Sequence, residues 1–194
     1  MLGTEKDTIL DALLPIIPFE GWTARAFTQA LQSCNLDEFT AYRTFPKGVA
    51  DAADYFVKRA DQRMLDELAT QTFDTPSITK KVSTAILTRL KQNLPYREAV
   101  RRALAFYALP NHATQGLVNL YQTVDAIWYF AGDTATDFNF YTKRAMLAGV
   151  YSTTLLFWLN DKSENQKDTE AFLARRLGNI GQINRLKQRI LRSS

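Results

Sequence analysis

Apolar residues recur at steps of three and four along almost the whole chain, and this spacing constrains the fold more than any other feature. No segment shows the strict alternation of apolar and polar residues that a half-buried strand requires. Proline and glycine separate the apolar stripes, as at Pro46, Gly48 and Pro110. The pattern therefore predicts an all-α protein of about nine helices in one compact unit.

Residues that commonly cap helices mark where several of these helices begin. Thr23, Asp37 and Ser77 each precede an apolar stripe, and each has a side-chain oxygen that can accept a hydrogen bond from a backbone N–H of the first turn. Pro46 and Pro110 are expected to end helices. The periodicity predicts helices near 9–17, 24–31, 38–45, 49–68, 77–93, 99–109, 113–131, 138–159 and 168–191.

Residues 21–47 have the proportions of a helix-turn-helix motif. The run A-Y-R-T-F-P-K resembles the end of a TetR recognition helix, where Tyr42 and Lys47 would contact DNA phosphates. A DNA-reading surface depends on an excess of positive charge, which this segment lacks. Between Glu20 and Lys47 there are three cations, Arg25, Arg43 and Lys47, and three anions, Glu20, Asp37 and Glu38. We therefore expect no nucleic-acid partner, and a TetR-type transcription regulator with an apolar effector is the alternative.

The chain carries few side chains suited to catalysis or metal binding. Its single cysteine, Cys34, excludes an intrachain disulfide, and its single histidine, His112, is expected in the first turn of a helix. It has no Glu-x-x-His pair, no phosphate-binding glycine loop and no nucleophile motif. We therefore expect a protein that is not an enzyme, without catalytic residues, metal ligands or a cofactor.

The N-terminal residues are polar and lack both the apolar stretch of a secretion signal and the Arg/Ser bias of a mitochondrial presequence. The longest apolar run, near 153–159, is too short to cross a bilayer. A location in a bacterial-type cytoplasm is expected.

The most specific stretch is A-G-D-T-A-T-D-F-N-F-Y-T-K-R, residues 131–144. A helix start needs one small polar cap, so the adjacent aromatic residues and the two cations exceed what capping requires. Because a helix buries residues three or four positions apart, Phe140 and Tyr141 cannot both lie at the centre of one buried stripe. Phe140 fits the inward face with Arg144 or Leu147, and Tyr141 is expected near the rim.

This stretch resembles the central signature of the Coq-nine family, accessory proteins of ubiquinone biosynthesis. The resemblance is close over residues 124–176 and extends more weakly back to Phe19. It implies a TetR-like helical fold, lipid binding, and assistance to the di-iron hydroxylase that acts on demethoxyubiquinone. The family usually has tryptophan where this chain has Phe140, which keeps the apolar bulk but loses the indole N–H.

The resemblance implies three sets of site residues. The hydroxylase would dock on Asp137, Asn139, Phe140, Tyr141, Lys143 and Arg144. A phospholipid or isoprenoid quinone precursor would contact Leu120, Val124, Ile127, Trp128, Leu147, Tyr151, Leu155 and Trp158, for which an ordinary core is the alternative. A basic amphipathic helix would contact the membrane surface, or pack on the body or a second subunit, through Leu177, Ile180, Ile183, Arg185, Leu186, Lys187, Arg189 and Ile190.

Together these inferences predict a helix-turn-helix remnant at 1–48, a lipid-binding helical body at 49–175 and a basic amphipathic helix at 176–194. The expected function is that of a non-enzymatic accessory protein that presents a polyprenyl quinone precursor to the demethoxyubiquinone hydroxylase. A homodimer, peripheral on the inner face of the cytoplasmic membrane, is expected.

Overall fold

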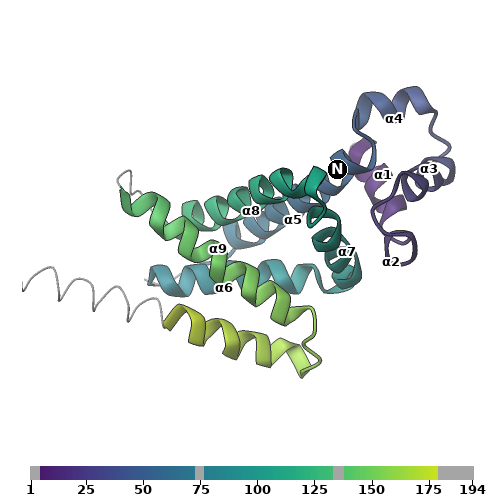
Figure 1. The fold of residues 1–194 in the computed structure, drawn as a ribbon. Coiled ribbons are helices and arrows are strands. Elements are labelled where there is room, and N and C mark those ends of the chain that lie inside the picture. Colours follow the sequence, from purple (N-terminus) through teal and green to yellow (C-terminus); the bar gives the residue numbers. More distant parts are fainter. Residues whose placement is uncertain (1–4, 73–76, 133–137, 179–194) are drawn as a thin grey trace, which may run out of the picture. The chain divides into compact units, whose positions relative to one another are not determined.

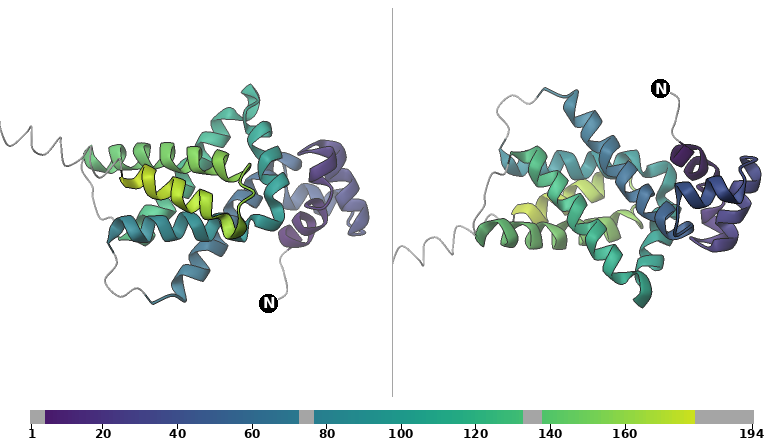
Figure 2. Two further views of the ribbon diagram at one scale, coloured as in Figure 1. Left: turned by 90° about the horizontal axis from the view of Figure 1, so that it is seen from below. Right: turned by 90° about the horizontal axis from the view of Figure 1, so that it is seen from above.

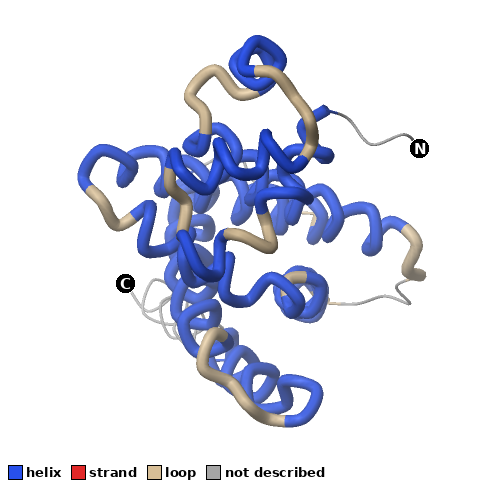
Figure 3. Tube along the Cα trace, turned by 90° about the vertical axis from the view of Figure 1, so that its right-hand side faces the viewer, coloured by secondary structure: helices blue, strands red, loops and turns tan. Residues whose placement is uncertain are grey.

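Helices make up the fold of this protein. The computed structural model describes residues 5–72, 77–132 and 138–178, and no β-strand occurs among them (Figure 1). The elements in chain order are α1 (Glu5–Leu13), α2 (Ile17–Glu20), α3 (Ala24–Ser33), α4 (Glu38–Thr44), α5 (Val49–Ala69), α6 (Ile78–Gln92), η1 (Leu94–Tyr96), α7 (Arg97–Tyr107), α8 (Pro110–Ala131), α9 (Phe138–Trp158) and η2 (Glu164–Gln166). Residues 167–178 are helical as well, and loops separate the helices (Figure 3). The expected all-α class is confirmed.

The three expected helix caps are present. The Thr23 hydroxyl accepts a hydrogen bond from the Ala26 N–H at 3.2 Å, and the Asp37 carboxylate accepts one from the Thr40 N–H at 2.7 Å. The Ser77 hydroxyl accepts one from the Lys80 N–H at 3.3 Å. Each cap satisfies a backbone donor that has no partner within its own helix.

One expected boundary needs correction. Pro110 was expected to end a helix, but it lies three residues after α7 and is the first residue of α8. Proline suits this position, because it lacks the N–H that a first-turn residue leaves without an intrahelical partner, and its φ angle is already helical. His112 accordingly lies in the first turn of α8, as expected, and its ring stacks on that of Phe106 with the centroids 3.9 Å apart.

The chain forms two compact units. The first comprises Met1–Arg63 and Gln92–Leu120, and the second comprises Met64–Lys91 and Tyr121–Ser194. Helices α5 and α8 each contribute residues to both units. The boundaries expected near residues 48 and 175 do not coincide with these units, and the functional division that they describe stays a prediction.

In the first unit, α1 packs against α3, and α2 packs against α7. The Trp22 indole N–H donates to the Ala99 carbonyl at 3.1 Å, which ties the loop before α3 to α7. The Phe45 ring packs edge-on against the Phe27 ring, with the centroids 6.1 Å apart. The apolar core of these N-terminal helices contains Ile9, Leu10, Leu13, Ile17, Ala26, Phe27 and Ala30.

A polar network joins α5, α7 and α8 within the same unit. The Tyr107 hydroxyl donates to the Asp54 carboxylate at 2.6 Å, and the Asn119 amide donates to the same oxygen at 2.8 Å. Burial, followed by the hydrogen bond to Asp54, raises the pKa of Tyr107, so its hydroxyl keeps the proton that it donates. Nearby, a Cβ on Gly116 would lie 2.8 Å from the Tyr107 Cβ, which shows how closely α7 and α8 approach.

The second unit has its core between α6, the second half of α8, α9 and the helical residues 167–178. This last segment runs back along α9 (Figures 1 and 2), and the Phe172 ring stacks on Phe157 with the centroids 4.5 Å apart. The buried apolar residues include Val82, Ala85, Ile86, Leu90, Val124, Ile127, Leu147, Val150, Leu155, Trp158 and Leu173.

Candidate functional site

The start of α9 is held to α8 by one buried arginine. Arg144 is only 6% exposed, and its Nε donates to the Asp125 carboxylate of α8 at 2.7 Å. The guanidinium lies 3.3 Å from the centroid of the Phe140 ring. Its Nη1 also donates to the Phe140 carbonyl at 3.4 Å. Because these contacts use several edges of one rigid planar group, they fix the orientation of the Phe140 ring.

A second contact between α8 and α9 lies close by in the chain. The Trp128 indole N–H donates to the Lys143 carbonyl at 3.3 Å, and the Lys143 ammonium lies 5.9 Å from the centroid of the Trp128 ring. Lys143 therefore contributes to α8–α9 packing through its backbone and covers an aromatic ring with its charge. Phe140, Lys143 and Arg144, which are expected to dock the hydroxylase, thus have structural roles in the free protein, and their docking role stays a prediction.

Tyr141 differs from these residues because its ring extends outward. It is 68% exposed and packs edge-on against Phe140, with the centroids 5.1 Å apart and the rings inclined at 77°. Helix geometry points adjacent side chains in different directions, and accordingly Phe140 is half-buried while Tyr141 lies at the surface. We call Trp128, Phe140 and Tyr141 the aromatic surface. Asp137 lies outside the described residues, and of Asn139 only the helical backbone is described.

Sequence reasoning missed Tyr129, which is 82% exposed and follows Trp128 in α8. Its position carried a usable signal, because Tyr121, Asp125 and Tyr129 are spaced four residues apart and share the outward face of α8. The buried Val124 and Ile127 define the opposite face.

The residues expected to contact lipid lie mainly in the second unit. Leu120 belongs to the first unit and is half-buried, and Trp128 is also half-buried. The others, which are buried, are Val124, Ile127, Leu147, Tyr151, Leu155 and Trp158. This packing suits an ordinary core, and the lipid-binding role of these residues stays a prediction.

The same region holds a buried cation that sequence reasoning missed. Arg89 of α6 is buried, donates to the Tyr151 hydroxyl at 2.6 Å, and places its guanidinium 5.5 Å from the centroid of the Tyr151 ring. The apolar spacing of α6 predicts this inward position, because Val82, Ile86 and Leu90 occupy neighbouring places on the same face. A buried charge is costly unless it has polar partners, and the Tyr151 hydroxyl is one such partner for Arg89 in this core.

The helix that precedes the expected membrane segment has a well-defined start. The Asp161 carboxylate accepts hydrogen bonds from the Ser163 N–H at 2.7 Å and the Thr169 N–H at 2.9 Å, and from the Thr169 hydroxyl. Burial raises the pKa of Asp161, but these hydrogen bonds outweigh it and lower the pKa to about 2. Leu177 is half-buried in the helical residues 167–178. The other expected membrane residues, Ile180, Ile183, Arg185, Leu186, Lys187, Arg189 and Ile190, lie outside the described residues.

The helix-turn-helix expected from the sequence corresponds to α3 and α4, and Asn35 adopts a left-handed φ of 52° in the turn between them. Arg43 of α4 donates from Nη2 to both carboxylate oxygens of Glu5, at 2.8 and 2.9 Å. The hydrogen bonds from Arg43 and then from Thr44 lower the pKa of Glu5, which keeps this ion pair charged. Tyr42 and Lys47 are exposed.

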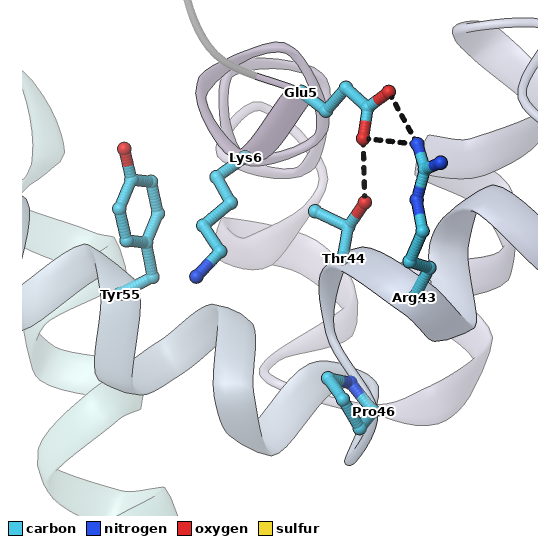
Figure 4. Close-up of a pocket in the computed structure, with 6 residues that line it drawn as sticks. All are labelled: Glu5, Lys6, Arg43, Thr44, Pro46 and Tyr55. Atoms are coloured by element: carbon cyan, nitrogen blue, oxygen red, sulfur yellow. Dashed lines mark hydrogen bonds and ion pairs between the residues drawn. The ribbon is translucent and has the colours of Figure 1, made fainter.

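A pocket of about 730 Å³ opens beside this ion pair (Figure 4). Its walls come from α1, α4 and α5 and the loop between the last two. The lining residues are Glu5, Lys6, Arg43, Thr44, Pro46 and Tyr55.

Comparison with known proteins agrees with the resemblance seen in the sequence. Residues 113–184 match the family model named COQ9. The human protein named ubiquinone biosynthesis protein COQ9, mitochondrial, is 35% identical over 87% of this chain and 55% of its own length. The resemblance to the COQ9 family is confirmed. Relatives of the same name from Bos taurus and Schizosaccharomyces pombe are 34% and 28% identical, over 87% and 98% of this chain.

The chain spans about half the length of the human and Bos taurus relatives, 55% in each case, and 75% of the one from Schizosaccharomyces pombe. The COQ9 match covers the whole of the aromatic surface and the residues expected to contact lipid.

The fold has a solved counterpart in the TetR transcriptional regulator from Nitrosomonas europaea. The TM-score is 0.74 at 21% identity, and the alignment covers 91% of this chain and 97% of the regulator. The expected TetR-like fold is therefore confirmed. Within the described residues, no helix combines the length and the apolar character needed to cross a membrane.

Proposed function

We propose that this chain is a non-enzymatic accessory protein of ubiquinone biosynthesis. It binds a phospholipid or a polyprenyl quinone precursor and presents the quinone head group to the demethoxyubiquinone hydroxylase. The proposal is supported by the COQ9 relatives, which are named as ubiquinone biosynthesis proteins. A carrier has a clear physical purpose in such a pathway, because isoprenoid tails are driven out of water.

The exposed Tyr141 is the observation that carries the docking part of the proposal. Its ring packs edge-on against the Phe140 ring. The Arg144 guanidinium in turn stacks on the Phe140 ring and donates to the Phe140 carbonyl. The surface is therefore ordered before a partner arrives, and little side-chain entropy is lost on binding. Exposed aromatic residues beside cations are typical of the residues that dominate protein–protein affinity.

Tyr141→Ala tests the docking surface directly. We expect hydroxylase affinity to fall about thirtyfold, which corresponds to the loss of about 2 kcal/mol typical of an interface anchor. The thermal midpoint should stay almost unchanged, because the ring is mostly exposed in the free protein. Calorimetry with purified hydroxylase measures the first quantity, and circular dichroism measures the second.

Lys162→Ala is the matched control, since Lys162 is exposed in the turn after α9. It should change neither affinity nor stability. Unfolding of Tyr141→Ala would show that the residue is part of the core. Unchanged affinity in a folded variant would remove Tyr141 from the docking surface.

A DNA-binding regulator is the second candidate function, favoured by the fold of the Nitrosomonas europaea regulator. The ion pair between Arg43 and Glu5 argues against it, because a neutralised cation adds little to phosphate binding.

The COQ9 relatives are named as mitochondrial. A peripheral position on the inner face of a bacterial-type cytoplasmic membrane, a membrane role for the C-terminal segment and a homodimer stay predictions.

A further inference from the structure

The pocket beside the Arg43–Glu5 ion pair lies wholly within the first unit. Its volume of about 730 Å³ is in the range of sites that hold small organic molecules. It is far along the chain from the aromatic surface and from the residues expected to contact lipid, so neither of those roles accounts for it. The charges and rings along its walls decide which molecule fits.

Glu5 is the acidic residue of this pocket, and its carboxylate is already engaged. Arg43 Nη2 donates to both carboxylate oxygens, and the Thr44 hydroxyl donates to one of them at 3.1 Å. These hydrogen bonds lower the pKa of Glu5, so the carboxylate stays ionised and holds the Arg43 guanidinium. A cationic ligand would have to displace Arg43 from Glu5, and the pocket therefore disfavours cations.

Lys6 supplies the charge that remains. Its ammonium lies on the Tyr55 side of the pocket (Figure 4), 5.7 Å from the centroid of the Tyr55 ring and 5.8 Å from that of Phe45. Among the described residues, no carboxylate forms an ion pair with it. Two cations and one anion line the pocket, so their net charge of +1 matches a singly charged anion.

The remaining walls offer flat apolar surfaces. Pro46 lies in the loop between α4 and α5, and the Tyr55 ring is held in place because its hydroxyl donates to the Asp7 carboxylate at 2.8 Å. A ring held in this way packs well against a second flat ring. A small ion such as free phosphate would leave these apolar surfaces uncovered, whereas an aromatic molecule would remove them from water.

We propose that this pocket binds a small aromatic carboxylate, which pairs with the Lys6 ammonium and packs its ring against Tyr55 and Pro46. Lys6 is exposed, so the ion pair by itself is weak and burial of the ring has to add to the affinity. The net charge of the walls favours a carboxylate over a phosphate monoester, which carries nearly two negative charges at neutral pH. Binding at this site requires neither lipid nor the hydroxylase.

Fluorine NMR of para-fluorobenzoate with the full-length chain, in a buffer free of phosphate and other carboxylates, tests this proposal. We expect saturable binding that Lys6→Gln weakens about fivefold, the upper end for an exposed ion pair. Glu5→Gln should instead strengthen binding about twofold or more, because Arg43 then becomes available to the ligand. Opposite effects of two substitutions in one pocket cannot come from a general loss of folding.

Two further probes separate the charge of the ligand from its ring. Fluoroacetate keeps the carboxylate without the ring, and para-fluorobenzyl alcohol keeps the ring without the charge. We expect each to bind at least about fivefold more weakly than para-fluorobenzoate. Inorganic phosphate should displace para-fluorobenzoate only at a large excess.

Lys47→Gln is the matched control, because it removes the same charge at an exposed position next to Pro46 without altering the lining of the pocket. Its affinity for para-fluorobenzoate should equal that of the unmodified protein. Absence of saturable binding, or equal losses with Lys6→Gln and Lys47→Gln, would overturn the proposal. Weaker binding by a folded Glu5→Gln variant, or equal affinity for fluoroacetate, would overturn it as well. Because this experiment contains no lipid and no hydroxylase, its outcome is independent of the docking and lipid tests.

Discussion

Two glycines within helices, Gly116 and Gly149, have opposite surroundings. Gly116 allows α8 to approach Tyr107, and an added Cβ would lie 2.8 Å from the Tyr107 Cβ. Gly149 lies on the exposed side of α9, and an added Cβ would meet no atom within 4 Å. Glycine lowers helix stability relative to alanine at both positions. Any difference between the two alanine variants in free energy of unfolding therefore comes from packing.

We predict that Gly116→Ala destabilises the protein and that Gly149→Ala stabilises it. Overpacking at position 116 costs about 1–3 kcal/mol, of which the better helix propensity of alanine returns at most about 1 kcal/mol. At position 149 the gain of about 0.5–1 kcal/mol has no opposing contact. Urea unfolding monitored by circular dichroism gives both free energies. A gain in stability for Gly116→Ala would contradict the close approach of α7 and α8.

At the scale of the element, the helical residues 167–178 depend on Asp161 for their start. The hydrogen bonds from Ser163 and Thr169 require an ionised carboxylate, which explains why the pKa of Asp161 falls to about 2 from an ordinary value of 3.8. A lowered pKa in the folded state stabilises folding above the unfolded value. The contribution is therefore complete above about pH 4 and is lost as the pH falls through 2.

We predict that Asp161→Asn lowers the free energy of unfolding by about 1–2 kcal/mol near neutral pH, the usual effect of losing a charged cap. The difference from the unmodified protein should shrink as the pH is lowered from 4 towards 2. Urea unfolding at a series of pH values measures it. Asp168→Asn is the control, because Asp168 is exposed. A difference that stays constant over this pH range would show that the charge of Asp161 is not what holds the helix start.

Individual helices were predictable from the sequence because their signals are local. Thr23 and Asp37 cap α3 and α4 as expected, and the adjacency of Phe140 and Tyr141 correctly indicated that one ring lies at the surface. Contacts across the chain were not predictable in this way. The pairing of Arg43 with Glu5 joins residues 38 positions apart, and no periodicity within either helix indicates it.

At the scale of the whole molecule, the same limit applies to the division into two units. Periodicity shows which face of α5 or α8 is buried, but not that each helix supplies residues to both units. The TetR-like fold was predicted from the resemblance of the signature stretch and from the proportions of residues 21–47, and the Nitrosomonas europaea regulator supports it. A tightly packed core and a lipid site are lined by the same residue types, so a substitution that affects them differently distinguishes the two.

Leu155→Trp separates these two roles of the second unit. If the late helices hold lipid, we predict that the larger ring fills part of the lipid space, so that stability changes little and lipid carriage is lost. If the region is solid core, overpacking should cost about 1–3 kcal/mol. Native mass spectrometry after exposure to liposomes containing an isoprenoid quinone measures carriage, and thermal unfolding measures stability. Leu156→Trp, at an exposed neighbouring position, is the control. A destabilised variant and an unmodified protein that takes up no lipid would contradict lipid binding.

The ion pair between Arg43 and Glu5 also has an evolutionary consequence. Arg43 belongs to the helix-turn-helix, but it forms an ion pair with Glu5 of α1, which lies outside that motif. The effect of a mutation at position 43 therefore depends on which residue stands at position 5. Among descendants of this sequence the two positions should therefore covary.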